Sequence, residues 1–578
     1  MRPDHFDAVV IGSGFGGSVT AYRLAEAGLR VCVLERGQAY PPGSFPRAPH
    51  AVRRGFWDPS EGTYGMYDVW SFKGLEALVS SALGGGSIIY ANVLLRKDEK
   101  WFVREDLTGG GYEYWPVTRA ELDPHYDRVE RMMKPQRYPF EHAPYDATPK
   151  TRALREAAET LGYAWHLPPL AVTFGNEGAA PVPGEPIPEA HPNLHGRTRY
   201  TCRLCGECDI GCNYGSKNTL DYNYLSEAKR LGAEIRTLCE VKAFEPHNQG
   251  FVVWYVEHDP AGTSEGRPRK AVTADRLIVA AGTLGSTYLL MKNRAAFPNL
   301  SDRLGSRFCG NGDLLAFALN ARCPDPATGR LGPRVLDPNF GPVITSTLRV
   351  GDALDGDGAV GRGFYLQDAG YPAFLSWIVE SADVFGAFKR FVRLVRNVFR
   401  ARLGGDTNLS REVQDLVGGT LSSCAVPLLG MGRDLPTGRF SMEGKWLQTD
   451  WRLDDSKAYF DRLKGTMREV ADYLEADFVV NPTWLLKRVI TVHPLGGCPM
   501  GRGPHEGVVD AHGQVFGHPN LYVADGAILP GPVGPNPALT IAALADRIAD
   551  GILAARSGRA GAAVSVPSAV PPSAPPSA

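Results

Sequence analysis

The sequence predicts an α/β fold: a Rossmann-like nucleotide-binding domain assembled from discontinuous segments, with an inserted substrate domain that contains a β-sheet. Three observations predict this fold. A glycine-rich turn joins a strand to a helix near the N-terminus, further glycine-rich turns lie near the C-terminus, and a block with strand-like alternation lies between them. Turns suited to a nucleotide at both ends of a chain indicate one domain that another interrupts.

The N-terminal unit has the pattern of a βαβ start. Phe6–Ile11 is a short apolar run typical of a buried strand, and Ser18–Ala27 has the pattern of a helix. A second strand is predicted at Arg30–Leu34, and it ends at the acidic residue Glu35. This order of strand, glycine turn, helix and strand predicts a dinucleotide-binding unit.

The turn inside this unit matches G-x-G-x-x-G through Gly12, Gly14 and Gly17. The first glycine permits a tight turn, the second lets the backbone approach a pyrophosphate, and the third lets the helix pack close to the strand. The helix N-terminus adds free N–H groups and the positive end of its dipole. Glu35 stands about twenty residues further on, where an acid accepts a hydrogen bond from a ribose hydroxyl.

Composition narrows the class of protein. The chain has 578 residues, 43% hydrophobic and 22% charged, which excludes a mostly disordered chain. Its formal net charge of −1 gives no basic field that would mark a nucleic-acid binder. We find no apolar run of about 18–20 residues that would span a membrane and no secretory signal pattern. We therefore expect a cytoplasmic protein, and its association with a membrane surface stays open.

Changes in pattern along the chain predict the domain boundaries. Residues 1–310 are assigned to the first part of the nucleotide-binding domain, including a cysteine-rich segment at 200–215, and residues 489–556 to its last part. Residues 311–488 are assigned mainly to the substrate-binding domain. The Ala-, Pro- and Ser-rich tail 557–578 is expected to be disordered. Helices are predicted at Ser456–Leu474 and Ala538–Arg556.

Four of the ten cysteines crowd into one short run. They are Cys202, Cys205, Cys208 and Cys212. Their spacing resembles the bacterial ferredoxin iron–sulfur run, with Asn213 where proline is usual. The fourth ligand of a cluster stays open, because in ferredoxins the last cysteine of the run binds a second cluster. Cys212 could be this ligand, Cys239 could replace it, or the cluster could hold only three irons. Zinc and four buried thiols without metal are the rival interpretations. Such clustering is not a disulfide framework and indicates a reducing compartment.

Residues 384–403 form a basic amphipathic stretch. Its apolar residues recur near the helical period, and it carries six Lys or Arg residues and no acidic residue. This composition is typical of an interfacial membrane helix. The stretch therefore predicts peripheral membrane contact, and the alternative is a helix packed on the core with solvated arginines.

Several further motifs follow the N-terminal turn in a fixed order. They are Gly84–Asn92, Leu277–Leu290, HPLGG at His493–Gly497, Asp525-Gly526 and PNPALT at Pro535–Thr540. With these motifs in this order, the sequence resembles the glucose–methanol–choline (GMC) flavoprotein oxidoreductases over nearly the whole chain. Within them it resembles the bacterial cholesterol-oxidase-like branch.

The resemblance implies FAD as the cofactor, which the glycine turn alone could not decide. It implies that Gly84–Asn92 lies beside the flavin ring and that Asp525-Gly526 is a second pyrophosphate contact. The expected cofactor-binding residues are Gly12, Gly14, Gly17, Glu35, Gly84, Gly85, Gly86, Ser87, Asn92, Val241, Asp525, Gly526 and Pro537. The resemblance implies His493 and Asn536 as the catalytic pair.

These two side chains suit alcohol oxidation by a flavin. Such an enzyme must hold and deprotonate the hydroxyl, point the C–H bond at flavin N5 and stabilise the negative charge of the reduced flavin. His493 can accept or orient the hydroxyl proton, and the Asn536 amide can hold the same oxygen. A helix starting near Pro537 could direct its dipole at the flavin. No motif places a further acidic base; Gln367-Asp368 and Glu380 are candidates.

We expect the protein to oxidise a hydrophobic, sterol-like secondary alcohol to the ketone by hydride transfer to FAD. The electron acceptor stays open. An iron–sulfur cluster would pass electrons to a partner protein, whereas an enzyme without a cluster would use dioxygen. The alternatives from other classes are a non-redox or light-driven flavoprotein on the same scaffold, and a non-catalytic electron-transfer protein.

Overall fold

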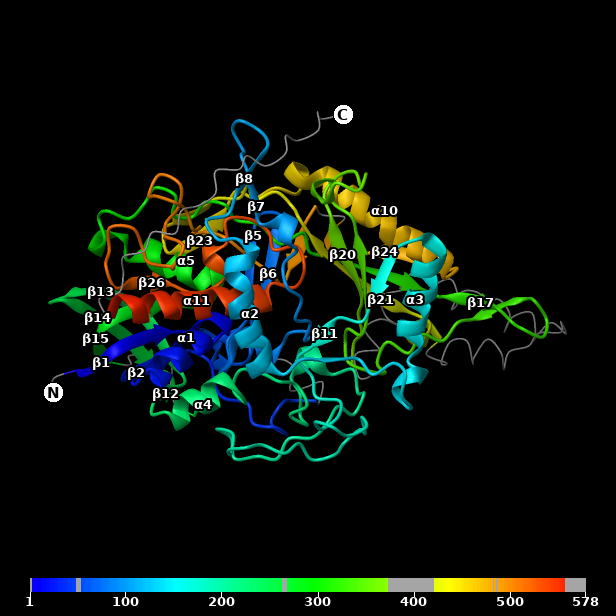
Figure 1. Ribbon diagram of the computed structural model, residues 1–578, viewed down its shortest axis with the longest axis horizontal. Coiled ribbons are helices and arrows are strands. Elements are labelled where there is room, and N and C mark those ends of the chain that lie inside the picture. The colour runs from blue at the N-terminus through cyan, green and yellow to red at the C-terminus, as the bar shows by residue number, and fades with distance from the viewer. Residues whose placement is uncertain are drawn as a thin grey trace, which may run out of the picture.

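The computed structural model describes residues 3–47, 54–261, 268–372, 420–481, 483–484 and 487–556. Two β-sheets lie side by side, each with its own helices (Figure 1). The basic stretch 384–403, the candidate acid Glu380 and the predicted tail 557–578 lie outside the described residues.

The first sheet is seven-stranded, and its central strands are parallel. Its strands are β12 (Glu234–Arg236), β2 (Val31–Leu34), β1 (Asp4–Ile11), β15 (Lys270–Val279), β14 (Gly250–Glu257) and β13 (Cys239–His247), with β26 (Leu521–Val523) also paired to β15. The strands β13 and β14 extend it in antiparallel fashion. Because β26 comes from the far end of the chain, the nucleotide-binding domain is built from discontinuous segments, as predicted.

Helices from both ends of the chain cover this sheet. The helix α1 (Phe15–Glu26) packs against α11 (Ala538–Arg556) and α4 (Tyr224–Arg230), and α11 packs against α2 (Arg119–Met133) (Figure 1). Arg23 of α1 and Arg128 of α2 both form ion pairs with Asp546 and Asp550 of α11. The helices predicted at 18–27 and 538–556 are therefore confirmed, and each is held to the other by packing and charge.

The second sheet is six-stranded and antiparallel throughout. Its order is β10 (Ala164–His166), β19 (Thr347–Val350), β20 (Phe364–Asp368), β21 (Val426–Gly432), β16 (Leu314–Leu319) and β24 (Asp477–Val480). The helices α3 (Pro149–Leu161) and α10 (Lys457–Tyr473) pack on it. The boundaries at 310 and 488 stay a prediction, and the sheet takes one strand, β10, from before residue 310.

Alternation along β20 decides which side chains face the helices. Phe364 and Leu366 are buried in the hydrophobic core shared with α10, whereas Tyr365 packs with Trp101 in a separate cluster. Successive side chains of a strand point to opposite faces, so Gln367 shares the face of Tyr365. That face turns a polar side chain away from the helices, toward the part of the molecule that carries Asn536.

A three-stranded sheet connects the two halves. The strand β25 (Val489–Thr491) pairs in parallel with β6 (Leu75–Ser80), and β6 pairs with β5 (Tyr67–Phe72). Parallel strands end at the same edge of a sheet. The segments that follow β25 and β6 therefore emerge together, and they carry His493 and the glycine stretch Gly84–Asn92.

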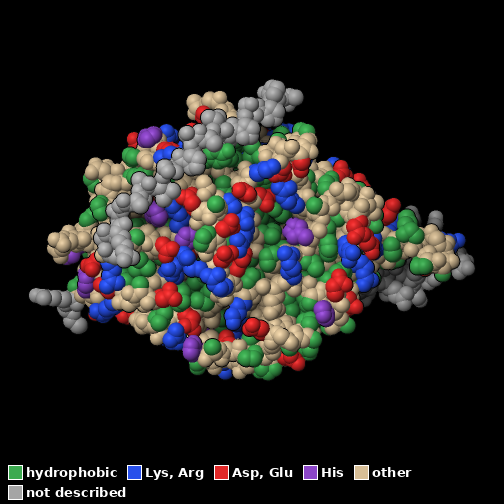
Figure 2. Space-filling model, in the orientation of Figure 1, with side chains coloured by type: hydrophobic (Ala, Val, Ile, Leu, Met, Phe, Trp, Pro, Cys, Tyr) green, Lys and Arg blue, Asp and Glu red, His purple; other side chains and the backbone are tan. Residues whose placement is uncertain are grey.

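No helix in the described part of the chain is long and apolar enough to cross a membrane. On the face shown in Figure 2, basic and acidic side chains are interspersed rather than gathered by sign. The surface thus fits the nearly balanced formal net charge of −1.

Two helical glycines provide a matched test of the packing of α1 on the sheet. A Cβ atom on Gly16 would lie 1.4 Å from the backbone oxygen of Ala524, whereas one on Gly465 in α10 would meet no atom within 4 Å. We expect Gly16→Ala to destabilise the protein by more than about 3 kcal/mol because the helix must move off β26. Gly465→Ala should stabilise it by about 0.5–1 kcal/mol. Urea unfolding measures both, and equal stabilities would contradict this packing.

Candidate active site

The carboxyl ends of the parallel strands meet at one edge of the first sheet. Gly12 follows β1, Gly282 follows β15 and Asp525 follows β26. Open α/β sheets bind ligands at this edge. The helix α1 also starts here, so its N-terminal N–H groups face the same region.

Two glycine stretches approach each other at this edge through their backbones. Gly85 has a φ of +52°, and a Cβ atom on it would lie 2.5 Å from the Cα atom of Gly14. The N–H of Gly84 donates to the Ser13 hydroxyl at 3.0 Å. The second glycine stretch thus packs directly on the nucleotide turn, as it must if both contact one cofactor.

Glu35 is buried, and most acceptor positions of its carboxylate are filled by hydrogen bonds from the protein itself. Its carboxylate accepts hydrogen bonds from the N–H and hydroxyl of Ser13, at 2.9 and 2.7 Å, and from the N–H of Gly37 at 2.8 Å. A carboxylate has about four acceptor positions, so one is left for a ribose hydroxyl. Val241 lies nearby in β13, whose first residue, Cys239, donates its N–H to the Glu35 carbonyl.

The residues at this edge fit FAD. Positions Gly14 and Gly86 face open space, since a Cβ atom at either would meet nothing within 4 Å. Asn92 is fully buried with a φ of 73°, and neither its amide nitrogen nor its amide oxygen has a partner among the described residues. A buried amide without partners is costly, and a polar cofactor would satisfy it.

The carboxylate of Asp525 makes its hydrogen bonds to other groups of the protein. It accepts hydrogen bonds from the N–H groups of Gly282 and Ala527, at 2.9 and 2.8 Å, and from the Ser286 hydroxyl at 2.5 Å. Burial raises its pKa to about 6. It ties the turn after β15 to the turn after β26, and the Gly526 carbonyl accepts the Gly496 N–H at 3.0 Å. A pyrophosphate contact at Asp525-Gly526 stays a prediction.

Ser87 holds the second glycine stretch to another segment. Its hydroxyl donates to the Gly84 carbonyl at 2.7 Å and accepts the Leu220 N–H at 3.1 Å. Pro537 immediately precedes α11, so the predicted helix start near it is confirmed. Direct contact of Ser87 or Pro537 with the cofactor stays a prediction.

His493 is oriented by a buried carboxylate. Its Nδ1 lies 2.8 Å from Oδ1 of Asp313, a side chain that is 2% exposed. The other oxygen, Oδ2, accepts the Thr491 hydroxyl at 2.9 Å and the N–H of Val492 at 2.8 Å. A carboxylate only accepts, so Nδ1 carries the proton. Nε2 is left as an acceptor, and it has no partner among the described residues.

Asn536 is held by Gln367 of the second sheet. The Gln367 Nε2 donates to Asn536 Oδ1 at 2.8 Å, and Asn536 Nδ2 donates back at 3.4 Å. Both side chains are buried. The amide nitrogen of Asn536 has two hydrogens, so one remains to donate to a substrate oxygen.

The loop before Asn536 is clamped from two sides. The Asn311 amide oxygen accepts the N–H groups of Val533 and Gly534, each at 2.9 Å. The buried Lys97 ammonium donates to the carbonyls of Pro532 and Val533, at 2.8 and 3.0 Å. Asn311 and Asp313 belong to one tight turn, so this turn holds both the His493 segment and the Asn536 loop.

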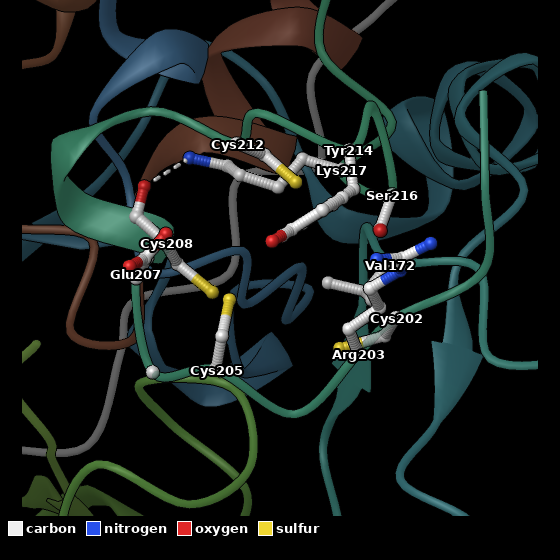
Figure 3. Close-up of a pocket in the computed structure, with 11 residues that line it drawn as sticks. Val172, Cys202, Arg203, Cys205, Glu207, Cys208, Cys212, Tyr214, Ser216 and Lys217 are labelled. Atoms are coloured by element: carbon white, nitrogen blue, oxygen red, sulfur yellow. Dashed lines mark hydrogen bonds between the residues drawn. The ribbon is translucent and has the colours of Figure 1, made fainter. Parts of the chain in front are cut away.

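The four cysteines of the run at 202–212 also come together around one cavity. Cys202, Cys205, Cys208 and Cys212 are all free thiols that line one small, partly enclosed cavity (Figure 3). The candidate acid Asp368 is buried elsewhere: its carboxylate accepts the N–H groups of Thr345 and Ser346, at 3.0 and 2.6 Å.

Comparison with known proteins decides the family. The profile of GMC oxidoreductases matches residues 193–308 and 449–545, and that of FAD dependent oxidoreductases matches residues 7–166. A cholesterol oxidase of Mycobacterium tuberculosis is 31% identical over 95% of this chain and 91% of its own length. The chain belongs to the GMC oxidoreductase family. Within it, the chain belongs to the cholesterol-oxidase-like branch.

Other relatives of this GMC enzyme agree. A cholesterol oxidase of Acinetobacter baumannii is 28% identical over 94% of this chain and 93% of its own length. The crystal structure of pyridoxine 4-oxidase from Mesorbium loti has the same fold, with a TM-score of 0.53, 16% identity and coverage of 94% of this chain and 98% of that one. Membership of the GMC oxidoreductase family makes the protein an FAD-dependent enzyme that oxidises alcohols.

Sequence reasoning missed the residues of this GMC enzyme that hold the predicted catalytic pair. They are Lys97, Asn311, Asp313 and, as a partner of Asn536, Gln367. The CGNGD run at 309–313 carried a signal, because a glycine-flanked Asn and Asp indicate a tight polar turn. Nothing in that run shows which distant loops the turn contacts.

Asp313→Asn tests the orientation of His493. An asparagine can offer N–H to Nδ1 and favour the wrong imidazole tautomer, so we expect alcohol-driven flavin reduction to slow by about 10²–10⁴-fold. FAD content should stay unchanged. Anaerobic stopped-flow measures the rate, with Asp477→Asn at the exposed start of β24 as the control. Rates within about twofold of each other would show that the carboxylate does not orient the histidine.

Proposed function

We propose that the enzyme oxidises a hydrophobic, sterol-like secondary alcohol to the ketone, with His493 and Asn536 acting on the hydroxyl. The observation that carries the proposal is the Asp313–His493 hydrogen bond of 2.8 Å, which leaves Nε2 free to accept a proton. The sterol class is supported by the similarity to two proteins named cholesterol oxidase.

The chain's own residues divide the work. Nε2 of His493 takes the hydroxyl proton, and the free N–H of Asn536 holds the substrate oxygen as it gains negative charge. FAD, when bound, accepts the hydride from the substrate carbon. The clamps by Asn311 and Lys97 fix the Asn536 loop beforehand, so little reorganisation is needed when the substrate arrives.

The cofactor contacts are part of the same proposal. The N-terminus of α1 and the two glycine stretches hold the FAD pyrophosphate and flavin, Asn92 bonds to the cofactor, and Glu35 and Val241 line its ribose end. The dipole of α11, which starts after Pro537, stabilises negative charge on the flavin.

The electron acceptor depends on the four-cysteine cavity. Without a metal there, dioxygen takes the two electrons together with two protons and becomes hydrogen peroxide, as the oxidase names of the relatives indicate. With an iron–sulfur cluster there, the electrons pass one at a time to a partner protein.

His493→Ala and Asn536→Ala test the catalytic pair. Each should slow flavin reduction by an anaerobically added sterol by about 10²–10⁴-fold, because proton transfer and orientation are lost. Stopped-flow absorbance of the flavin gives the rate, and His505→Ala, an exposed histidine of the same segment, is the matched control. Unchanged rates in both variants would refute the assigned roles. If sterols do not reduce the flavin but short alcohols or sugar alcohols do, the proposed substrate class is refuted.

Peripheral membrane contact through residues 384–403 completes the proposal. Six basic residues and no acidic one should bind anionic vesicles at low salt and release them at high salt, because salt screens exposed charges. Sedimentation with phosphatidylserine vesicles measures this binding. Absence of binding at low salt would end the proposal.

A further inference from the structure

The four-cysteine cavity is built by a loop with an unusual backbone. Leu204, Gly206 and Gly211 all have positive φ values, of 60°, 65° and 81°. A Cβ atom on Gly206 would lie 2.7 Å from the Asn339 carbonyl oxygen. These tight turns fold the loop back on itself, and Figure 3 shows the sulfur atoms of Cys205, Cys208 and Cys212 turned into the cavity.

Both sides of this loop are fixed to other parts of the protein. On one side, Gly341 exchanges two backbone hydrogen bonds with it, from the Gly206 N–H at 2.9 Å and to the Leu204 carbonyl at 3.0 Å. On the other, the Asn213 amide makes two hydrogen bonds of 3.0 Å to the backbone of Phe45. Asn213 replaces the proline of ferredoxin runs and serves as an anchor. The cavity is therefore a prepared site rather than a chance gathering of thiols.

The spacing of the sulfurs argues against a single ion. A tetrahedral zinc ion with Zn–S bonds of about 2.3 Å brings its sulfurs to about 3.8 Å from one another. No three of these four sulfurs lie within 4.8 Å of one another; among the described residues, only His125, Asp546 and Asp550 form such a set. A cluster of several irons spreads its cysteine ligands, because each sulfur binds a different iron.

Charge points the same way. The Lys217 ammonium is 1% exposed and donates to the Cys208 carbonyl at 2.8 Å. Lys150, equally buried, donates to the Pro342 carbonyl at 2.9 Å. Within the described residues, neither ammonium has a carboxylate partner at salt-bridge distance; the carboxylate of Asp209 interacts with both at longer range, and that of Asp368 with Lys150. Buried cations need negative charge nearby. Thiolates holding iron would add negative charge to that of these carboxylates, since Cys208 also lies close enough to interact with both lysines.

We propose that this cavity binds an iron–sulfur cluster of several irons through Cys202, Cys205, Cys208 and Cys212, and not a single zinc ion. Lys217 also donates to the carbonyls of Ile88 and Tyr90, at 3.0 and 2.9 Å, within the stretch expected beside the flavin. The cluster thus lies one side chain from the flavin site. Its role as an electron acceptor rests on the proposed function; its presence does not.

Metal and sulfide analysis of the anaerobically purified full chain tests this site. We expect about four irons and four acid-labile sulfides per wild-type chain, with little zinc. Cys205→Ser should lose most of both while keeping FAD. Cys323→Ser, a half-buried cysteine of the hairpin strand β17 (Arg322–Pro324), is the matched control and should keep both. Dithionite reduction should give an electron paramagnetic resonance signal in the wild type and the control alone.

Wild-type protein with no more iron and sulfide than Cys205→Ser overturns the inference, as does zinc in place of iron. These readouts are separate from alcohol oxidation. Protein without iron whose flavin is still reduced by a sterol would sink the cluster and leave the proposed function standing. Protein that holds a full cluster but whose flavin is reduced by no alcohol would refute the proposed function and leave the cluster standing.

Discussion

One short turn between the two halves of the molecule holds the two predicted catalytic side chains in place. Asp313 fixes the imidazole of His493 through Nδ1, and Asn311, in the same turn, bonds to the backbone before Asn536. Among the described residues, the side chain of His493 bonds to Asp313 and that of Asn536 to Gln367, with no direct hydrogen bond between the two. A proton acceptor and an oxygen-holding amide can work on one hydroxyl only if their separation is fixed, and this turn is the element that contacts both segments.

Glycine backbones form the floor beneath that site. Gly85 approaches Gly14 so closely that a side chain on Gly85 would separate the two stretches. The buried amide of Asn92, which has no partner among the described residues, lies in the same stretch, where a cofactor would complete its hydrogen bonds. Glycine backbone therefore lines the proposed FAD site, and hydrogen-bonded side chains stand at the proposed substrate site.

The cysteine cavity adds a second prepared site next to this floor. Lys217 contacts the carbonyls of both the cysteine run and the second glycine stretch, so a change of charge in the cavity would be felt beside the flavin. A buried ammonium in that position links the two sites electrostatically as well as structurally.

The sequence by itself determined the parts that depend on local pattern. The βαβ start, the helix at 538–556, the family and the four-cysteine run all follow from spacing within short segments, because turns and periodicity are local properties. The roles of Asp313 and Gln367 were decided only by the tertiary structure. Asp313 lies 180 residues before His493, and Gln367 lies 169 residues before Asn536. Hydrogen bonds across such separations leave no periodic trace, so only the packing of the two sheets reveals which polar side chains meet.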